Sequence, residues 1–470
     1  MGRIEKPVEM TTFYIEQFGC RATQADAAAI ERQLRDRGFA AASESARADV
    51  VIVNTCTVTA AADAQARDAI RKLHARNPAA RVIATGCYAQ RAPEELAELP
   101  GVSWVVGNSH KPEIPLLLDL PGEGTAGRSA SGFVPASALG DEKLSLLHGP
   151  AKILTGDIFE QRALLAAPVI GGEGNHTRPV VKIQDGCNSR CAYCVIPFVR
   201  GRSRSLEPAQ VIEEIARLSA SGYREIVLSG INLGTYGRDL SPRVELIELL
   251  RRILDETSVE RLRISSIEPT DVTEELIALF ASNERMAQHF HMPLQSGCDR
   301  VLAAMHRWYR AEHYARRVEL IRERLPDAGI GADVIAGFPG ETDAEHAETV
   351  AFIGALPFSY LHVFSFSQRP GTRAAELPNQ VQPAVVKNRA RELRALGEEK
   401  AKEFRRSQSG RELRVLTLRS NLESAEKTPA LSSNYLQVRV PGRFAANEWL
   451  DVVMKDGLVA EAALSAGPSS

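Results

Sequence analysis

The sequence predicts an α/β protein with an N-terminal doubly wound parallel sheet, a central partial (β/α)6 barrel and a small C-terminal antiparallel β domain. Three observations predict this organisation. The chain has 470 residues, which is more than a single core usually contains. Apolar, strand-like runs alternate with helical patterns through two long stretches, which is typical of βαβ units. The last stretch shows only short apolar runs separated by turn residues.

The first stretch of alternation gives an N-terminal domain over residues 9–120. Its strand-like runs are TFYIEQF, ADVVIVNTC, RVIATGC and VSWVVG. Cys20, Cys56 and Cys87 each follow the end of a predicted strand. Because the carboxyl ends of parallel strands share one edge of an open sheet, where ligands bind, we expect the three cysteines to meet there. The alternative is that they are buried as small hydrophobic side chains.

The middle of the chain contains a linker and a second stretch of alternation. Residues 121–177 are rich in Gly, Ala and Ser and are interpreted as the linker. Over residues 178–409 the alternation resumes for about six βα rounds, which favours a partly closed barrel with its chemistry at the carboxyl ends of the strands. Polar motifs fall at four of these ends: SGIN (229–232), SSIEP (265–269), PLQSG (293–297) and GFPGE (337–341).

The charge distribution restricts any contact with nucleic acid to local patches. The net charge of −2 excludes the global positive field of a protein built to bind nucleic acid over its whole surface. A local excess of Lys and Arg lies between Lys387 and Arg414, just before and into the predicted antiparallel domain, residues 410–465. We expect this stretch and the tail to bind RNA weakly.

Composition and cysteine usage indicate a cytoplasmic protein with metal chemistry. No apolar run approaches the roughly 18 residues of a membrane helix, and the start, MGRIEKPVEM, lacks the apolar segment of a secretory signal. The seven cysteines are an odd number in a chain without an export signal. Metal binding or catalysis is therefore favoured over disulfides.

The strongest chemical motif is Cys187, Cys191 and Cys194, spaced C-x3-C-x2-C directly after a predicted strand. Three thiolates on a short loop suit an iron-sulfur cube that usually takes four ligands, and the missing ligand leaves one iron open for chemistry. A zinc site is the alternative, but no fourth Cys or His stands nearby at a typical zinc spacing.

Several other polar residues allow two interpretations. His289 and His291 share one strand face, where packing and hydrogen bonding are favoured over a metal site. GFPGET lacks the Lys of a phosphate-binding loop and is interpreted as a barrel turn. Cys298 is expected to begin a helix without a ligand role. Three arginines beside the cysteine loop are candidate phosphate contacts or a solvated face: Arg200, Arg202 and Arg204.

The segment KIQDGCNSRCAYCVIPFVRGRSRS resembles the cluster loop of the radical S-adenosylmethionine (SAM) superfamily and, within it, the methylthiotransferases. The resemblance extends over nearly the whole chain except the linker, and it implies a radical SAM barrel and a C-terminal TRAM domain. FGC, NTC and TGC, which end at Cys20, Cys56 and Cys87, match the positions that hold an auxiliary cluster in this family. Thr23 stands where the family usually has Asn, which affects a contact near Cys20 rather than the ligand.

This resemblance implies two [4Fe-4S] clusters and SAM as cofactors, and an electron donor such as flavodoxin or ferredoxin. A SAM-derived 5′-deoxyadenosyl radical would abstract hydrogen from carbon, and a second SAM and the auxiliary cluster would supply the methylthio group. The residues in motifs that match the family's SAM contacts are Tyr193, Gly230, Asn232, Ser266, Glu268 and Gln295.

The substrate implied by the resemblance is N6-threonylcarbamoyladenosine at position 37 of tRNA, methylthiolated at C2 in the anticodon loop. NTCTVT, KIQDGC and RGRSRS resemble that branch of the family most closely. The alternatives within the family are N6-isopentenyladenosine in tRNA and ribosomal protein S12. The alternative from another class is a non-catalytic iron-sulfur sensor or RNA-binding regulator, which leaves the barrel and its polar motifs without a purpose.

Overall fold

The computed structural model describes residues 11–118, 151–162, 164–165, 167, 177–419, 426–455 and the backbone of 462–464. The chain divides into two compact units. The first contains the described residues up to Ala167 together with Gly186–Asn188 and Val195–Arg202, and the second contains the rest. Among the helices of the described residues, none is both long and apolar enough to cross a membrane.

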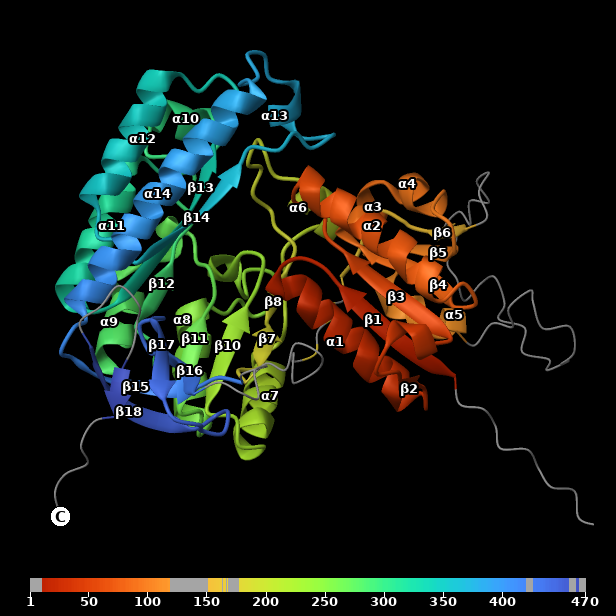
Figure 1. Ribbon diagram of the computed structural model, residues 1–470, viewed down its shortest axis with the longest axis horizontal. Coiled ribbons are helices and arrows are strands. Elements are labelled where there is room, and N and C mark those ends of the chain that lie inside the picture. Colours follow the sequence, from red (N-terminus) through yellow and green to blue (C-terminus); the bar gives the residue numbers. More distant parts are fainter. Residues whose placement is uncertain are drawn as a thin grey trace, which may run out of the picture. The chain divides into compact units, whose positions relative to one another are not determined.

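The first unit is built on a six-stranded parallel sheet of order β2-β1-β3-β4-β5-β6 (Figure 1). Its strands are β1 (Thr12–Gln17), β2 (Ala40–Ala41), β3 (Val50–Thr55), β4 (Arg81–Gly86), β5 (Val102–Gly107) and β6 (Lys152–Leu154). Its helices are α1 (Arg21–Asp36), α2 (Ala60–Arg76), α3 (Cys87–Arg91), α4 (Pro93–Ala97) and α5 (Ile114–Leu118).

Both faces of this sheet are covered, as the sequence predicts for a doubly wound fold. In β3, Val51 and Val53 pack into a core with α2, whereas Val50 and Ile52 pack into a separate core with α1. This alternation follows from the two-residue period of a strand. One expectation needs correction, because β6 lies inside the expected linker and pairs in parallel with β5. Linker residues 121–150, 163, 166 and 168–176 lie outside the described residues.

The second unit contains six parallel strands in two three-stranded sheets, of orders β11-β10-β7 and β12-β13-β14. The strands are β7 (Val180–Lys182), β10 (Glu225–Ser229), β11 (Arg261–Ile264), β12 (His289–His291), β13 (Gly329–Ala336) and β14 (Tyr360–Ser365). Isolated bridges from Leu262 to Met286 and from Ser266 to His291 connect the two sheets. The six strands therefore form the partial barrel that the sequence predicts.

Helices cover the outside of this barrel. They include α7 (Pro208–Ala220), α8 (Leu246–Glu256), α9 (Glu274–Ser282), α11 (Ala311–Arg324), α12 (Asp343–Ala355) and α14 (Pro383–Ser407). Helix α8 buries Leu246, Leu249, Leu250, Ile253 and Leu254, which is the i, i+3, i+4, i+7, i+8 spacing of one helix face. Figure 1 shows α11, α12 and α14 side by side along β13 and β14.

The C-terminal segment forms an antiparallel sheet of order β17-β16-β15-β18-β19. Its strands are β15 (Glu412–Thr417), β16 (Lys427–Ser432), β17 (Gln437–Pro441), β18 (Trp449–Met454) and β19 (Ala462–Leu464). It packs against the first residues of the barrel strands, because Arg261 and Arg263 donate to the carbonyls of Leu431 and Ser432, each at 3.0 Å. The tail thus closes the end of the barrel opposite the carboxyl ends of its strands.

A buried ion-pair cluster joins the barrel to this tail. The Glu225 carboxylate accepts from Arg178 at 3.0 Å, from Arg261 at 2.5 Å and from Arg263 at 2.7 Å. Burial alone would raise the pKa of Glu225, but the three guanidinium groups overcome it and hold the pKa well below its ordinary value.

Two cations of the basic stretch are also buried, namely Arg389, which pairs with Glu341, and Lys400. They therefore cannot contribute to the expected RNA-binding surface.

Candidate active site

Three cysteines gather at the carboxyl edge of the first unit's sheet. Cys20 caps the start of α1 after β1, Cys56 follows β3, and Cys87 begins α3 after β4. Gly19 has a φ of 102°, and a Cβ there would stand 2.6 Å from the Cβ of Cys56, so only glycine allows this approach. Burial, together with Cys87 and Cys20 nearby, raises the pKa of the Cys56 thiol to about 12. The expected meeting of the three cysteines is thus found within this unit.

Polar groups surround these sulfurs. Asn108 Nδ2 lies 3.5 Å from Cys87 Sγ, and Thr23 Oγ1 lies 3.6 Å from Cys20 Sγ. Thr23 therefore places its hydroxyl beside the cysteine, where the resembling family usually has an amide. Buried Asp26 pairs with Lys111 at 2.8 Å and with Arg200 at 3.0 Å. Burial lowers the pKa of Lys111, and the negative charge of Asp26 partly offsets this lowering. Such donors and cations suit thiolate ligands.

One group of three potential metal ligands lies elsewhere in the described part of the chain. The ligand atoms of His291, Asp333 and His362 all lie within 4.8 Å of one another.

The second cysteine group lies on the loop after β7, and backbone hydrogen bonds hold that loop in place. Cys187 donates its N–H to the carbonyl of Gly201 at 3.0 Å. The N–H of Cys194 reaches the carbonyl of Cys191 at 3.1 Å, and the N–H of Ala192 reaches that of Met305 at 2.9 Å. All three cysteines are partly exposed, as ligands of an accessible cluster must be.

Arg307 is a site residue that the sequence interpretation missed. Its Nη1 lies 3.4 Å from Cys191 Sγ, and its Nη2 pairs with the carboxylate of Glu268. The guanidinium also stands 5.0 Å from the ring centre of Tyr309. Burial raises the pKa of Glu268, although Arg307 opposes this effect, and burial raises the pKa of Tyr193 nearby. The sequence signal for Arg307 is the run MHRWYR, which combines cationic and aromatic residues directly after α10 (Asp299–Ala304).

The expected SAM contacts occupy the carboxyl ends of the barrel strands. The Asn232 backbone N–H donates to Gln184 Oε1 at 2.8 Å, and a Cβ on Gly230 would stand 2.9 Å from the same oxygen. The buried Asn232 Oδ1 has no hydrogen-bond partner among the described residues. An orphaned buried acceptor of this kind suits a ligand hydroxyl or amine.

Ser266 and Gln295 lie on neighbouring strand ends of the same rim. Ser266 is exposed and bridges to His291. Gln295 is buried with a φ of 67°, a backbone conformation that costs energy for a non-glycine residue and is concentrated at functional sites. The positions of Tyr193 and Glu268 beside Arg307 add two more of the expected residues to this rim.

A polar cluster lines the face of β12–β14 that points away from the outer helices. Tyr360 Oη lies 2.8 Å from His289 Nε2 and 2.9 Å from His291 Nδ1. Asp333 Oδ1 lies 3.0 Å from His291 Nε2 and 3.3 Å from His362 Nδ1. The expected hydrogen bonding of His289 and His291 is thus present, and His291 also belongs to the group of three potential ligands noted above.

Comparison with known proteins decides the family. Residues 12–107 match the "Uncharacterized protein family UPF0004", and residues 181–353 match the radical SAM superfamily. A threonylcarbamoyladenosine tRNA methylthiotransferase MtaB of Aquifex aeolicus is 36% identical over 91% of this chain and 96% of its own. The chain belongs to the radical SAM methylthiotransferase family.

Other relatives of this methylthiotransferase carry two different substrate names. The MtaB protein of Bacillus subtilis is 34% identical over 92% of this chain and 91% of its own. A tRNA-2-methylthio-N(6)-dimethylallyladenosine synthase of Thermobifida fusca is also 34% identical, over 86% and 77%. The radical SAM methyltransferase TsrM of Kitasatospora setae shares the fold, with a TM-score of 0.55, 17% identity and coverage of 78% and 77%. Superfamily membership implies a [4Fe-4S] cluster and SAM.

The structure changes the assignment of the three arginines in this methylthiotransferase. Arg200 is only 2% exposed and pairs with Asp26, and Arg204 is buried beside Asp185 at 3.8 Å. Neither offers an accessible guanidinium, so the expected phosphate contact does not fit them. Their neighbour Arg202 is exposed, and for this residue the contact stays a prediction.

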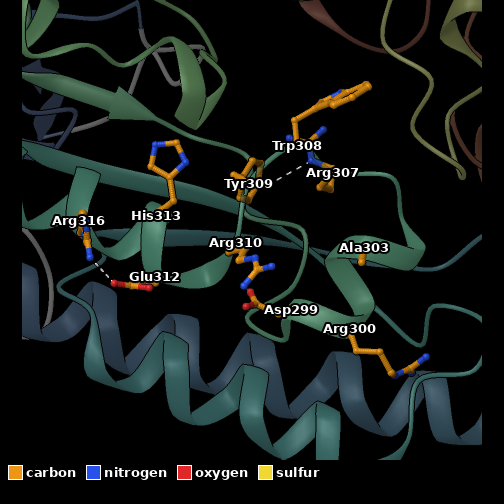
Figure 2. A pocket seen from close by; sticks show the side chains of 10 residues that line it. All are labelled: Asp299, Arg300, Ala303, Arg307, Trp308, Tyr309, Arg310, Glu312, His313 and Arg316. Atoms are coloured by element: carbon orange, nitrogen blue, oxygen red, sulfur yellow. Dashed lines mark hydrogen bonds and ion pairs between the residues drawn. The ribbon is translucent and has the colours of Figure 1, made fainter.

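A pocket of about 740 Å³ opens beside Arg307, between α10 and α11 (Figure 2). Its size falls within the range of ligand-binding pockets. It is lined by Asp299, Arg300, Ala303, Arg307, Trp308, Tyr309, Arg310, Glu312, His313 and Arg316.

Proposed function

We propose that this methylthiotransferase converts N6-threonylcarbamoyladenosine at position 37 of tRNA into its 2-methylthio derivative. The relatives from Aquifex aeolicus and Bacillus subtilis, whose names state this substrate, each cover more than nine-tenths of the chain. Identity alone does not separate them from relatives named for dimethylallyladenosine. The choice between the two substrates therefore depends on the chemistry of the barrel.

One observation carries the choice of substrate. The inner face of β12–β14 presents polar side chains, including His291, Asp333 and His362, of which His362 is 56% exposed on its side chain. A threonylcarbamoyl group carries a carboxylate and several hydrogen-bonding groups, whereas an isopentenyl group requires an apolar slot. This polar surface supports the threonylcarbamoyl substrate.

In this proposal each cysteine trio holds one [4Fe-4S] cluster. Cys187, Cys191 and Cys194 would bind the cluster that takes SAM, and Cys20, Cys56 and Cys87 would bind the auxiliary cluster. When bound, the two clusters and SAM supply the one-electron chemistry and the sulfur for replacing a C–H bond with a methylthio group. A small electron-transfer protein such as flavodoxin or ferredoxin would provide the electron.

The side chains of the protein position these groups. Arg307 fixes Cys191 by a hydrogen bond and is itself fixed by Glu268. Asn232 Oδ1 is available to accept from a hydroxyl or the amine of SAM. Cys56 and Cys87 are buried whereas Cys20 is exposed, so the auxiliary site is open to solvent on the side of Cys20. The hydrogen bond from Asn108 stabilises negative charge on Cys87.

The nucleosides of tRNA from cells that lack this protein test the proposal. Digested tRNA analysed by mass spectrometry should retain N6-threonylcarbamoyladenosine and lose its 2-methylthio form, and a plasmid copy of the gene should restore it. Loss of the methylthio form of isopentenyladenosine, or of the modification on ribosomal protein S12, would refute the assignment.

A further inference from the structure

Trp308 is exposed in a way that the local backbone explains. Arg307 turns inward to Cys191 and Glu268, and Tyr309 turns inward to donate its hydroxyl to the carbonyls of Pro293 at 2.7 Å and Leu294 at 2.8 Å. The side chain of Trp308, between these two inward-anchored neighbours, points outward. The indole is accordingly 76% exposed, and Figure 2 shows it extending away from the neighbouring helices. An indole exposed in this way offers a flat face on which a planar partner can stack.

Charge surrounds this indole. The pocket that it lines contains four arginines (Arg300, Arg307, Arg310 and Arg316) and two carboxylates (Asp299 and Glu312). Asp299 accepts from the N–H of Ala311 at 2.8 Å, and Glu312 pairs with Arg316. Within the described residues, the exposed Arg310 guanidinium has no ion-pair partner. Arg300 pairs with Glu345, Arg307 with Glu268 and Arg316 with Glu312, so Arg310 is the available cation at the surface of the pocket.

We infer that Trp308 stacks on an unpaired base of the tRNA substrate while Arg310 binds a neighbouring phosphate. This contact rests on the proposed function and adds the residues that would hold the anticodon loop. An aromatic platform among cations is the usual means of binding single-stranded nucleic acid. Arg307, which contacts Cys191 of the cysteine loop, directly precedes Trp308 in the chain. A base stacked on Trp308 would therefore lie beside the residue that contacts this loop.

A protein partner fits this surface less well. Protein interfaces bury contiguous apolar surface at their centre. Among the described residues, the other large exposed hydrophobic side chains are Val58, Leu116, Phe198 and Phe364, and none of them lines this pocket. Trp308 is thus an isolated aromatic side chain in a charged surrounding, which favours RNA.

The test measures binding of the cluster-loaded protein to an anticodon stem-loop RNA that carries N6-threonylcarbamoyladenosine. Trp308→Ala should weaken binding about 5- to 100-fold, the loss expected for one stacked base, and Trp308→Phe should restore part of it. RNA should quench tryptophan fluorescence in the wild type and much less in Trp308→Phe. Arg310→Gln should weaken binding and flatten its salt dependence by about one phosphate contact.

Arg324→Gln provides the matched control for Arg310→Gln. Arg324 is an exposed arginine at the end of α11, the helix that Arg310 caps, and lies about 21 Å from Arg310 along the helix axis. This variant should bind RNA like the wild type. Formation of 5′-deoxyadenosine without RNA should be unchanged in Trp308→Ala, which separates RNA binding from damage to the cluster. Binding of Trp308→Ala within twofold of wild type would overturn the inference.

Two further outcomes separate the inference from its alternatives. If Trp308→Ala retains RNA binding but loses activity with flavodoxin and not with dithionite, the surface serves a protein partner and the inference is wrong. If the wild type binds the stem-loop through Trp308 yet forms no methylthio product, the proposed function fails while the RNA contact stands.

Discussion

The Arg307 guanidinium donates to Cys191 Sγ at 3.4 Å and simultaneously pairs with Glu268. This relationship connects the cysteine loop after β7 to the end of β11 through a side chain that is only 5% exposed. A cation in this position stabilises thiolate charge and orients a ligand of the proposed cluster. Glu268, which the sequence analysis assigned to SAM, therefore has at least one role in positioning Arg307.

Replacing Arg307 with Lys should reduce SAM cleavage about 10- to 100-fold, as is typical when a partner of a metal ligand is changed. Lysine retains the charge but cannot contact Cys191 and Glu268 together, because it lacks the forked guanidinium. The measurement is 5′-deoxyadenosine formation under anaerobic conditions, with the electron paramagnetic resonance spectrum of the reduced cluster recorded in parallel. An unchanged spectrum and unchanged cleavage would show that Arg307 has no positioning role.

Changing Cys20, Cys56 and Cys87 together to Ala should halve the iron content, from about eight to about four atoms per chain. The variant should still cleave SAM reductively, because its remaining cysteines are on the loop after β7. It should form no methylthio product. Loss of SAM cleavage in a variant that retains an intact loop cluster would contradict this division of roles.

Replacing Asn232 with Ala should weaken SAM binding about 2- to 10-fold, the effect of one hydrogen bond. The basis is the buried Oδ1 of Asn232, which has no partner among the described residues. Asn232→Asp, which keeps an oxygen acceptor, should bind SAM nearly as well as the wild type. Calorimetric titration of cluster-loaded protein measures both variants, and equal affinities for the alanine variant and the wild type would contradict the assignment.

Glu225→Gln should lower the free energy of unfolding by about 3–5 kcal/mol, because it leaves Arg178, Arg261 and Arg263 without their buried counter-charge. The surface variant Glu256→Gln, which loses only an exposed pair with Arg252, should show no measurable change. Urea unfolding of the wild type and the two variants, all without iron-sulfur clusters, measures these differences. If both variants lose the same free energy of unfolding, the buried ion pairs of Glu225 do not stabilise the barrel and tail.

The pH dependence of this difference has a definite sign. The folded-state pKa of Glu225 lies well below the ordinary value of 4.5, so its stabilisation is complete above about pH 4.5 and is lost as the pH falls through the folded-state pKa. The difference in the free energy of unfolding between the wild type and Glu225→Gln should therefore become smaller only at acid pH. A difference that becomes smaller toward alkaline pH would contradict the assigned pKa shift.

The sequence was sufficient for the architecture because the strands are long apolar runs separated by helical patterns. Their carboxyl ends place Cys20, Cys56 and Cys87 at one edge, as parallel topology requires. Short β6 was missed because three residues within a segment rich in Gly and Ala carry little periodic signal.

Side-chain burial could not be derived in the same way. Arg200 and Arg204 stand beside the cysteine loop in the sequence, yet their carboxylate partners turn them into buried structural groups. Conversely, Arg307 lies 113 positions after Cys194 and reaches the loop only through the folded barrel, since Cys191 is its direct partner across a separation of 116 residues. Pairings over such separations depend on tertiary packing rather than on local pattern.

The most direct test of the central claim uses purified, anaerobically reconstituted protein with SAM, a reductant and two anticodon stem-loop RNAs. One RNA carries N6-threonylcarbamoyladenosine and the other carries N6-isopentenyladenosine, and mass spectrometry follows the products. The account predicts a 2-methylthio product from the threonylcarbamoyl RNA and little from the other. Methylthiolation of the isopentenyl RNA alone, or none of either while 5′-deoxyadenosine accumulates with both clusters intact, would contradict it.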